Sequence, residues 1–167
     1  HKAFDEATAI LAGDALLTLA FEILAEEIDD AKVAIKLIAR LAESAGGAGM
    51  VAGQMADLKA EKVAGSVELL EYIHTNKTAK MFRCSALCGA IAGRAKENEL
   101  QNLSQYGLNL GLAFQIADDI LDVCGSTDQL GKTVGKDVDA AKCTYPAVVG
   151  LEKSRDLEQR LTQKAVD

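Results

Sequence analysis

The chain has 167 residues, 49% of them hydrophobic, which is enough for one domain with a sizeable core. Its net charge of −7 argues against a nucleic-acid-binding protein, which would carry a basic stripe. A single proline, only 4% aromatic residues, and long runs of Ala, Leu, Ile, Glu and Lys favour an all-α fold.

The four cysteines do not have the paired spacing of a zinc site, and no secretory segment accompanies them. We therefore expect reduced thiols in a cytoplasmic protein. No apolar run approaches the roughly 20 residues of a membrane span, so we expect no membrane span.

The first predicted helix runs from about Phe4 to Glu27. Its apolar residues are spaced for one buried face, as at Ile10, Leu17 and Leu24. Asp14 falls on this stripe. It is either a buried, hydrogen-bonded brace between helices, which we prefer, or a functional carboxylate.

A second helix is predicted over residues 28–47, with Asp29 or Asp30 near its N-terminus and a stop at the following glycine pair. The next segment, residues 47–61, places Gln54 and Asp57 three apart on one helix face. Small residues around them, such as Gly53, would let another helix approach closely. This pattern predicts an internal polar pair.

A long helix is predicted over Ser66–Gly93 and contains Lys77 and Thr78. Another helix is predicted from about Asn98 to Cys124. The stretch that follows, residues 125–144, is rich in Gly, Lys and Asp and is typical of a loop. Helix resumes near Tyr145, where the following proline suits a first turn.

The helix that ends near residue 124 carries the acidic stretch "FQIADDILD". Gln115, Asp118 and Asp122 lie along one stripe, with Asp119 rotated by about 100 degrees. Apolar residues surround this stripe. Half-buried carboxylates one turn apart are suited to a hard cation, and oxygen ligands suit Mg²⁺. The alternative is a solvated acidic patch.

The glycine-rich loop after this helix holds three lysines, Lys132, Lys136 and Lys142. An acidic chain thus concentrates cations directly after its acidic motif. Flexible glycines would let the loop close over a phosphate group. The pattern favours a site that combines carboxylates, Mg²⁺ and a phosphate-bearing ligand, although Lys136 is better explained as a solvated loop lysine.

Five ordered motifs carry a resemblance to a known family: "GQMADL", "HTNKTAKMF", "FQIADDILDV", "LGKTVGKD" and "TYPAVVGLE". Together they resemble the trans-isoprenyl diphosphate synthases, the polyprenyl synthetase family that includes farnesyl and geranylgeranyl diphosphate synthases. The first predicted helix also looks like that family, and the resemblance covers essentially the whole chain.

The resemblance implies an isoprenoid-synthase-type helical bundle around a central cavity, a homodimer, and a location in the cytoplasm or, in a eukaryote, the plastid. It implies a prenyltransferase that condenses an allylic diphosphate with isopentenyl diphosphate, with Mg²⁺ as cofactor. The implied metal ligands are Asp118, Asp119 and Asp122, with Asp118 the most direct. Asp137 is implied to be an acid that supports these ligands without binding the metal itself. The implied substrate-binding residues are Lys77, Thr78, Gln115, Lys132, Lys142, Gln54 and Asp57; among these, Lys77, Gln115 and Lys132 are the implied catalytic residues.

The family's first aspartate-rich motif should lie upstream of His1. We therefore expect residues 1–167 to form a single helical domain that is part of a longer synthase chain without its N-terminal helices. Three alternatives remain open: a terpene cyclase of the same fold, a non-catalytic homologous subunit, and an acidic helical interaction protein without a metal site.

Overall fold

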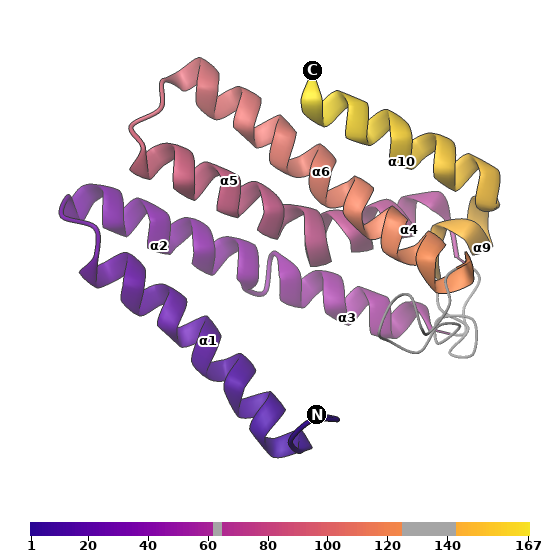
Figure 1. Ribbon diagram of the computed structural model, residues 1–167, viewed down its shortest axis with the longest axis horizontal. Coiled ribbons are helices and arrows are strands. Elements are labelled where there is room, and N and C mark those ends of the chain that lie inside the picture. The colour runs from indigo at the N-terminus through magenta and orange to yellow at the C-terminus, as the bar shows by residue number, and fades with distance from the viewer. Residues whose placement is uncertain (62–64, 125–142) are drawn as a thin grey trace.

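A computed structural model of the chain describes residues 1–61, 65–124 and 143–167, and within these ranges every regular element is a helix (Figure 1). This confirms the predicted all-α class. The elements are α1 (Glu6–Glu26), α2 (Ala31–Ala45), α3 (Met50–Ala60), α4 (Val67–His74), η1 (Thr75–Ala79), α5 (Lys80–Ala92), α6 (Glu97–Cys124), α9 (Tyr145–Val149) and α10 (Leu151–Val166).

The helices form successive rows, in which α2 is followed by α3 and α4 leads through η1 into α5 (Figure 1). α6 packs between α5 and α10 along much of its length, and η1 contacts both α3 and α6. The π-helical turn η1 thus lies between two helices that carry predicted site residues.

Short polar side chains and glycines set several of the helix ends. Asp30 caps α2 by accepting a hydrogen bond from the backbone N–H of Lys32 at 2.9 Å, and Gly46 is the C-cap of the same helix. Ser66 caps α4 by accepting from the N–H of Leu69 at 3.2 Å. Such caps satisfy backbone donors that a helix leaves unpaired. The predicted aspartate at the start of α2 and the glycine at its stop are confirmed, although the helix is shorter than the predicted 28–47.

Two glycines bring η1 into backbone contact with its neighbours. A Cβ atom at Gly53 of α3 would overlap the backbone nitrogen of Lys77 and lie 2.6 Å from its Cα. A Cβ atom at Gly111 of α6 would lie 2.6 Å from the Cα of Ala79. Because no larger residue fits, the glycines determine how closely α3 and α6 approach η1 from two sides.

A small apolar core lies beneath this junction. Its fully buried members are Leu70 and Ile73 of α4 and Ile116 of α6, and Tyr145 of α9 packs against them. Burial of a large aliphatic side chain stabilises the fold by about 1.5–3 kcal/mol. This core therefore fixes α4, α6 and α9 at the end of the molecule where the polar site residues gather.

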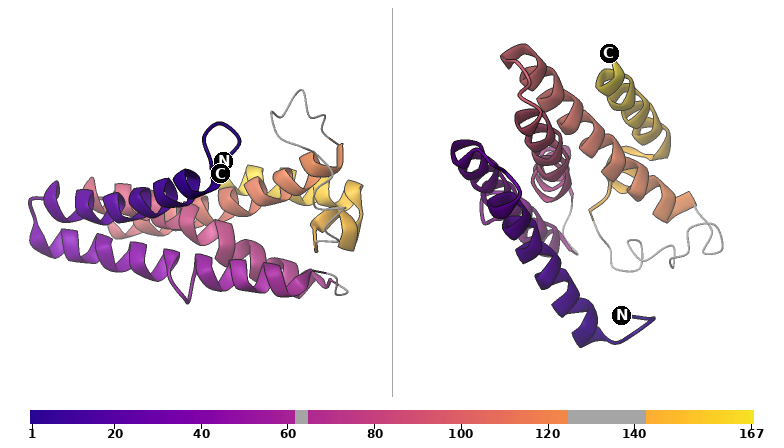
Figure 2. Two further views of the ribbon diagram at one scale, coloured as in Figure 1. Left: turned by 90° about the horizontal axis from the view of Figure 1, so that it is seen from below. Right: turned by 60° about the vertical axis from the view of Figure 1, so that its left-hand side comes forward.

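The predicted buried face of the first helix is wrong for this structure. None of the residues of α1 is buried, Asp14 is exposed, and large apolar side chains such as Ile10 and Leu16 face outward. The end of α1 that carries the N-terminus diverges from the other helices (Figure 2). The periodicity correctly identifies an apolar face, but among the described residues α2 is the main element that packs against this helix.

The premise that no apolar run approaches the length of a membrane span is wrong, because α1 is long and apolar enough by length and composition. Length and composition alone do not show a span, so the expectation of no membrane span stays a prediction. A core helix of a soluble protein and a signal sequence share these properties. None of the residues of α1 is buried, whereas a core helix would be mostly buried.

Candidate functional site

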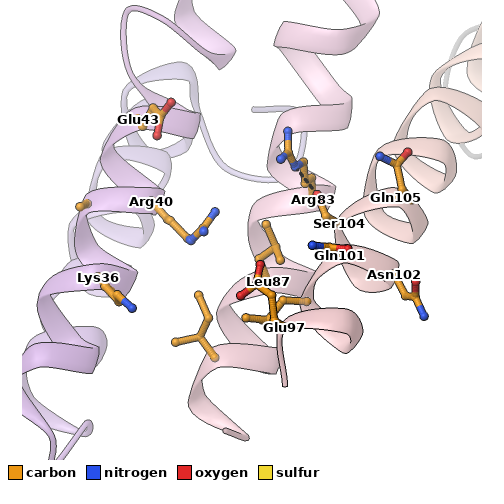
Figure 3. Close-up of a pocket in the computed structure, with 13 residues that line it drawn as sticks. Lys36, Arg40, Glu43, Arg83, Leu87, Glu97, Gln101, Asn102, Ser104 and Gln105 are labelled. Atoms are coloured by element: carbon orange, nitrogen blue, oxygen red, sulfur yellow. Dashed lines mark hydrogen bonds between the residues drawn. The ribbon is translucent and has the colours of Figure 1, made fainter. Parts of the chain in front are cut away.

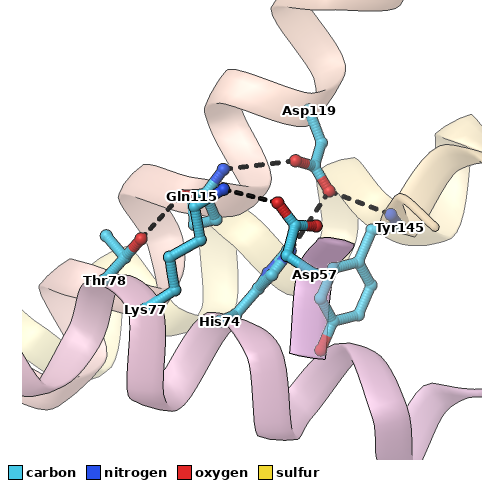
Figure 4. A network of polar contacts seen from close by, with 7 residues as sticks. All are labelled: Asp57, His74, Lys77, Thr78, Gln115, Asp119 and Tyr145. Carbon is cyan, nitrogen blue, oxygen red and sulfur yellow. Dashed lines mark hydrogen bonds and ion pairs between the residues drawn. The ribbon is translucent and has the colours of Figure 1, made fainter. Parts of the chain in front are cut away.

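The candidate site is organised around two consecutive residues of η1, whose side chains reach different helices (Figure 4). The ammonium of Lys77 contacts the Oδ2 atom of Asp57 on α3 at 2.6 Å. The hydroxyl of Thr78 donates a hydrogen bond to Oε1 of Gln115 on α6 at 2.7 Å. The turn η1 therefore links the polar face of α3 to the stripe of α6 that carries the acidic motif.

The π-helical geometry of residues 75–79 affects how the site residues are presented. A π-helical turn holds more residues than an α-helical one, so it changes the direction in which the following side chains point. Such turns are often found at functional sites, and this one lies where Gly53 and Gly111 let two helices approach.

The ion pair between Lys77 and Asp57 is mostly shielded from water. The side chain of Asp57 is 11% exposed and that of Lys77 is 29% exposed. In such a position each charged group depends on the other, because the partner replaces part of the water that burial removes. Lys77 thus presents a fixed cation at the edge of the network.

Asp119 points into the protein rather than along the Asp118 stripe. Its Oδ2 atom accepts a hydrogen bond from the backbone N–H of Tyr145 at 3.0 Å and lies 3.4 Å from Nε2 of His74. Its Oδ1 atom lies 3.4 Å from Nε2 of Gln115, which donates to it. Asp119 is only 4% exposed, so these protein donors take the place of water around its carboxylate.

His74 is the buried partner of this carboxylate. It is 3% exposed, and its ring lies 5.0 Å from the ring of Tyr145. Burial lowers the pKa of His74 to about 4, an effect that the charge of Asp57 opposes and that of Lys77 reinforces. The imidazole is therefore neutral at pH 7.

Five of the predicted site residues meet at this junction: Asp57, Lys77, Thr78, Gln115 and Asp119. Gln54 is half-buried on α3 but makes no hydrogen bond within the described residues. Lys132 and Lys142, together with Lys136 and Asp137, fall outside the described residues. Their roles stay predictions.

Asp118 is half-buried and Asp122 is buried near the end of α6. Across the described ranges, no three His, Cys, Asp or Glu side chains gather closely enough to hold a metal ion by themselves. The assignment of the acidic motif to Mg²⁺ therefore stays a prediction.

The sequence reasoning missed His74 and Tyr145. Both residues belong to motifs that carry the family resemblance, "HTNKTAKMF" and "TYPAVVGLE". The available signal was the position of His74, one helical turn before the Lys77–Thr78 pair, and thus on a similar side of the helix. Which carboxylate His74 contacts depends on how α6 packs against α4, and the spacing of residues along one helix does not show this.

A separate recess of about 920 Å³ lies between α2, α5 and α6 and shares no residue with the polar network (Figure 3). Cations and acids both line it, including Arg40, Arg83 and Glu97. Arg83 is oriented by a 2.7 Å hydrogen bond that its Nε–H donates to the hydroxyl of Ser104. The mixed charges around this recess select no particular ligand.

Comparison with known proteins places this geometry among related chains. The sequence profile of the polyprenyl synthetase family matches residues 1–167. Geranylgeranyl pyrophosphate synthase 12, chloroplastic, of Arabidopsis thaliana is 44% identical over 173 residues, covering 100% of this chain and 48% of its own length. Farnesyl diphosphate synthase of Geobacillus stearothermophilus is 48% identical over 160 residues, covering 93% of this chain and 54% of its own length.

The fold also matches a solved structure. The crystal structure of a geranyltransferase from Helicobacter pylori, complexed with magnesium and isoprenyl diphosphate, matches with a TM-score of 0.87 and 35% identity. The match covers 99% of this chain and 55% of that one. The chain thus spans about half the length of the relatives it matches, and the predicted type of helical bundle is confirmed.

Proposed function

Because the chain belongs to the polyprenyl synthetase family, we propose that the full-length protein is a trans-prenyltransferase. It condenses an allylic diphosphate with isopentenyl diphosphate to a longer trans-polyprenyl diphosphate, such as farnesyl or geranylgeranyl diphosphate. The observation that carries this proposal is the pair Lys77 and Thr78, held between Asp57 on α3 and Gln115 on α6.

The reaction develops negative charge on a departing diphosphate as the allylic carbon–oxygen bond breaks. A fixed cation stabilises that charge without reorganisation if it already lies in place. Lys77 supplies this cation, and its ion pair with Asp57 fixes its direction. The hydroxyl of Thr78 lies beside it and can donate to the diphosphate by turning its single O–H away from Gln115. The loop lysines Lys132 and Lys142 complete the diphosphate site, while Gln54 and Asp57 line it near the reacting carbons.

The carboxylates at the end of α6 fit Mg²⁺ by the chemistry of their donor atoms, since magnesium prefers oxygen ligands and shares phosphate oxygens with its substrate. We assign Mg²⁺ binding to the motif of Asp118, Asp119 and Asp122, with Asp118 as the principal ligand. Bound there, Mg²⁺ neutralises charge on the diphosphate. The motif's position on α6, with Gln115 one turn earlier beside Thr78, supports this assignment.

The same family membership supports a homodimer and the use of both diphosphate substrates by the complete protein. We propose a cytoplasmic location, or the plastid if the source is eukaryotic. The plastid is included because several of the plant relatives are named as chloroplastic.

The proposal is tested by thermal melting of the full-length protein with Mg²⁺ and a non-hydrolysable allylic diphosphate analogue, each alone and together. We expect a joint rise in melting temperature well above that from either ligand alone, because each completes the site of the other. Asp118→Ala should abolish the joint effect. Asp156→Ala, which removes an exposed acid on α10, should preserve it.

A product assay separates the proposed reaction from its alternatives. A prenyltransferase consumes isopentenyl diphosphate and lengthens the chain, whereas a terpene cyclase turns over the allylic substrate alone. A protein without a joint ligand effect, or without product under either condition, contradicts the proposal and supports a non-catalytic homologue.

A further inference from the structure

His74 ends α4 and faces the acidic end of α6 from inside the protein (Figure 4). Its Nε2 atom lies 3.4 Å from Oδ2 of Asp119, and the same oxygen accepts the backbone N–H of Tyr145. The other ring nitrogen, Nδ1, is buried and has no hydrogen-bond partner within the described residues. The ring thus packs between Asp119 of α6 and Tyr145 of α9.

The surroundings of the ring determine where its proton lies. A neutral imidazole has one N–H donor and one acceptor nitrogen. A carboxylate oxygen needs a donor, and an acceptor at Nε2 would repel it. The proton therefore lies on Nε2 and faces Asp119, while Nδ1 is the acceptor that stays unpaired.

The Asp119 carboxylate joins this histidine to the substrate side of α6. Its other oxygen, Oδ1, accepts from the amide of Gln115, and the amide oxygen of Gln115 accepts from the hydroxyl of Thr78. A continuous chain of contacts therefore runs from the interior of the protein to the predicted diphosphate site.

We propose that His74 is a positioning residue for the acidic motif: with the Tyr145 N–H, it holds the Asp119 carboxylate inward and so fixes the rotation of α6 that presents Asp118 to the ligand. Adjacent residues of a helix point about 100 degrees apart, so anchoring Asp119 determines the direction of Asp118. This inference rests on the proposed function. Within the acidic motif, it gives Asp119 an anchoring role beside Asp118, the principal ligand.

Removal of the ring would leave the buried Asp119 carboxylate with one donor fewer. The carboxylate would then move toward water, and Asp118 and Gln115 would lose their fixed directions. Residues that orient metal ligands from behind typically change metal affinity by about 10- to 100-fold when they are replaced. The effect should therefore appear in the response to Mg²⁺ rather than only in stability.

The test compares three variants of the full-length protein: His74→Leu, His74→Gln and Leu37→Ala. We expect His74→Leu to raise the Mg²⁺ concentration for half-maximal activity about tenfold, the low end for such residues. His74→Gln, whose amide N–H can still face Asp119, should recover most of this loss. Leu37→Ala empties buried space on α2, away from this junction, and should lower the melting temperature while leaving the Mg²⁺ midpoint unchanged.

A nitrogen-15 NMR spectrum of the imidazole provides a readout that a purely structural role would not give. We expect a proton on Nε2, facing Asp119, and a changed Nε2 resonance in Asp119→Asn. A ring whose Nε2 carries no proton would overturn the proposal.

The outcomes also separate this inference from the proposed function. A wild-type protein that shows neither a Mg²⁺ response nor prenyl transfer refutes the function, and the positioning role with it. A normal wild-type response, with the same Mg²⁺ midpoint in His74→Leu, refutes the positioning role alone.

Discussion

Replacing Gly53 with alanine should destabilise the protein, although the same change elsewhere in a helix stabilises it. A glycine inside a helix costs about 1 kcal/mol relative to alanine. At Gly53 the new methyl would overlap backbone atoms of Lys77, which cannot rotate away as a side chain can. Overpacking of this kind costs about 1–3 kcal/mol. Because the overlap is with backbone, we take the upper end, about 3 kcal/mol, and subtract the gain of about 1 kcal/mol from helix propensity. Gly53→Ala should therefore lower the free energy of unfolding by about 2 kcal/mol.

Gly89 of α5 provides the matched control, because a Cβ atom there would meet nothing within 4 Å. Gly89→Ala should stabilise the protein by about 1 kcal/mol, so the two variants differ by about 3 kcal/mol. Urea unfolding with a common slope measures both free energies. If Gly53→Ala matches or exceeds the stability of the wild type, α3 does not pack on η1 as described.

Three further predictions concern the polar network. Asp57→Asn should destabilise the protein by about 1–2 kcal/mol, less than a fully buried pair because Lys77 is partly exposed; a double-mutant cycle with Lys77→Met by urea unfolding measures the coupling. Thr78→Val should cost about 1 kcal/mol in the same assay by removing the hydrogen bond to Gln115, whereas Thr78→Ser should retain it. In the unfolded chain His74 takes up a proton as the pH falls through its usual pKa of 6.5, but in the folded protein it does so only near pH 4. The free energy of unfolding should therefore decrease as the pH falls through this window. Between pH 7 and 5.5 the wild type should lose about 1 kcal/mol more than His74→Gln, and equal losses in the two proteins would contradict a neutral buried imidazole.

Much of the helical framework could be predicted because its signals are local. Asp30 satisfies backbone donors within three residues, and Gly46 ends the same helix. The small residues beside Asp57 indicated an internal carboxylate, and Asp57 is buried. These features depend on interactions across a few residues of the chain, which the sequence displays directly.

The errors at α1 have the opposite origin. Its apolar spacing predicted a buried face for Ile10 and Leu17, yet both are exposed because, in the part of the chain that the structure describes, little besides α2 packs against the helix. Periodicity shows that a face is apolar but not what covers it. Length and composition have the same shortcoming: they show that α1 is apolar and long enough to cross a membrane, but not what surrounds it.

The sequence by itself determined that an acidic motif, a Lys77–Thr78 pair and a polar α3 face exist, and their order indicated the family. Only the tertiary structure decided that Lys77 turns to Asp57 while Thr78 turns to α6. It also decided that Asp119, adjacent to Asp118, faces His74 in the interior. The physical reason is that identical side chains acquire different roles from the helices packed around them, and that packing joins residues far apart in the chain.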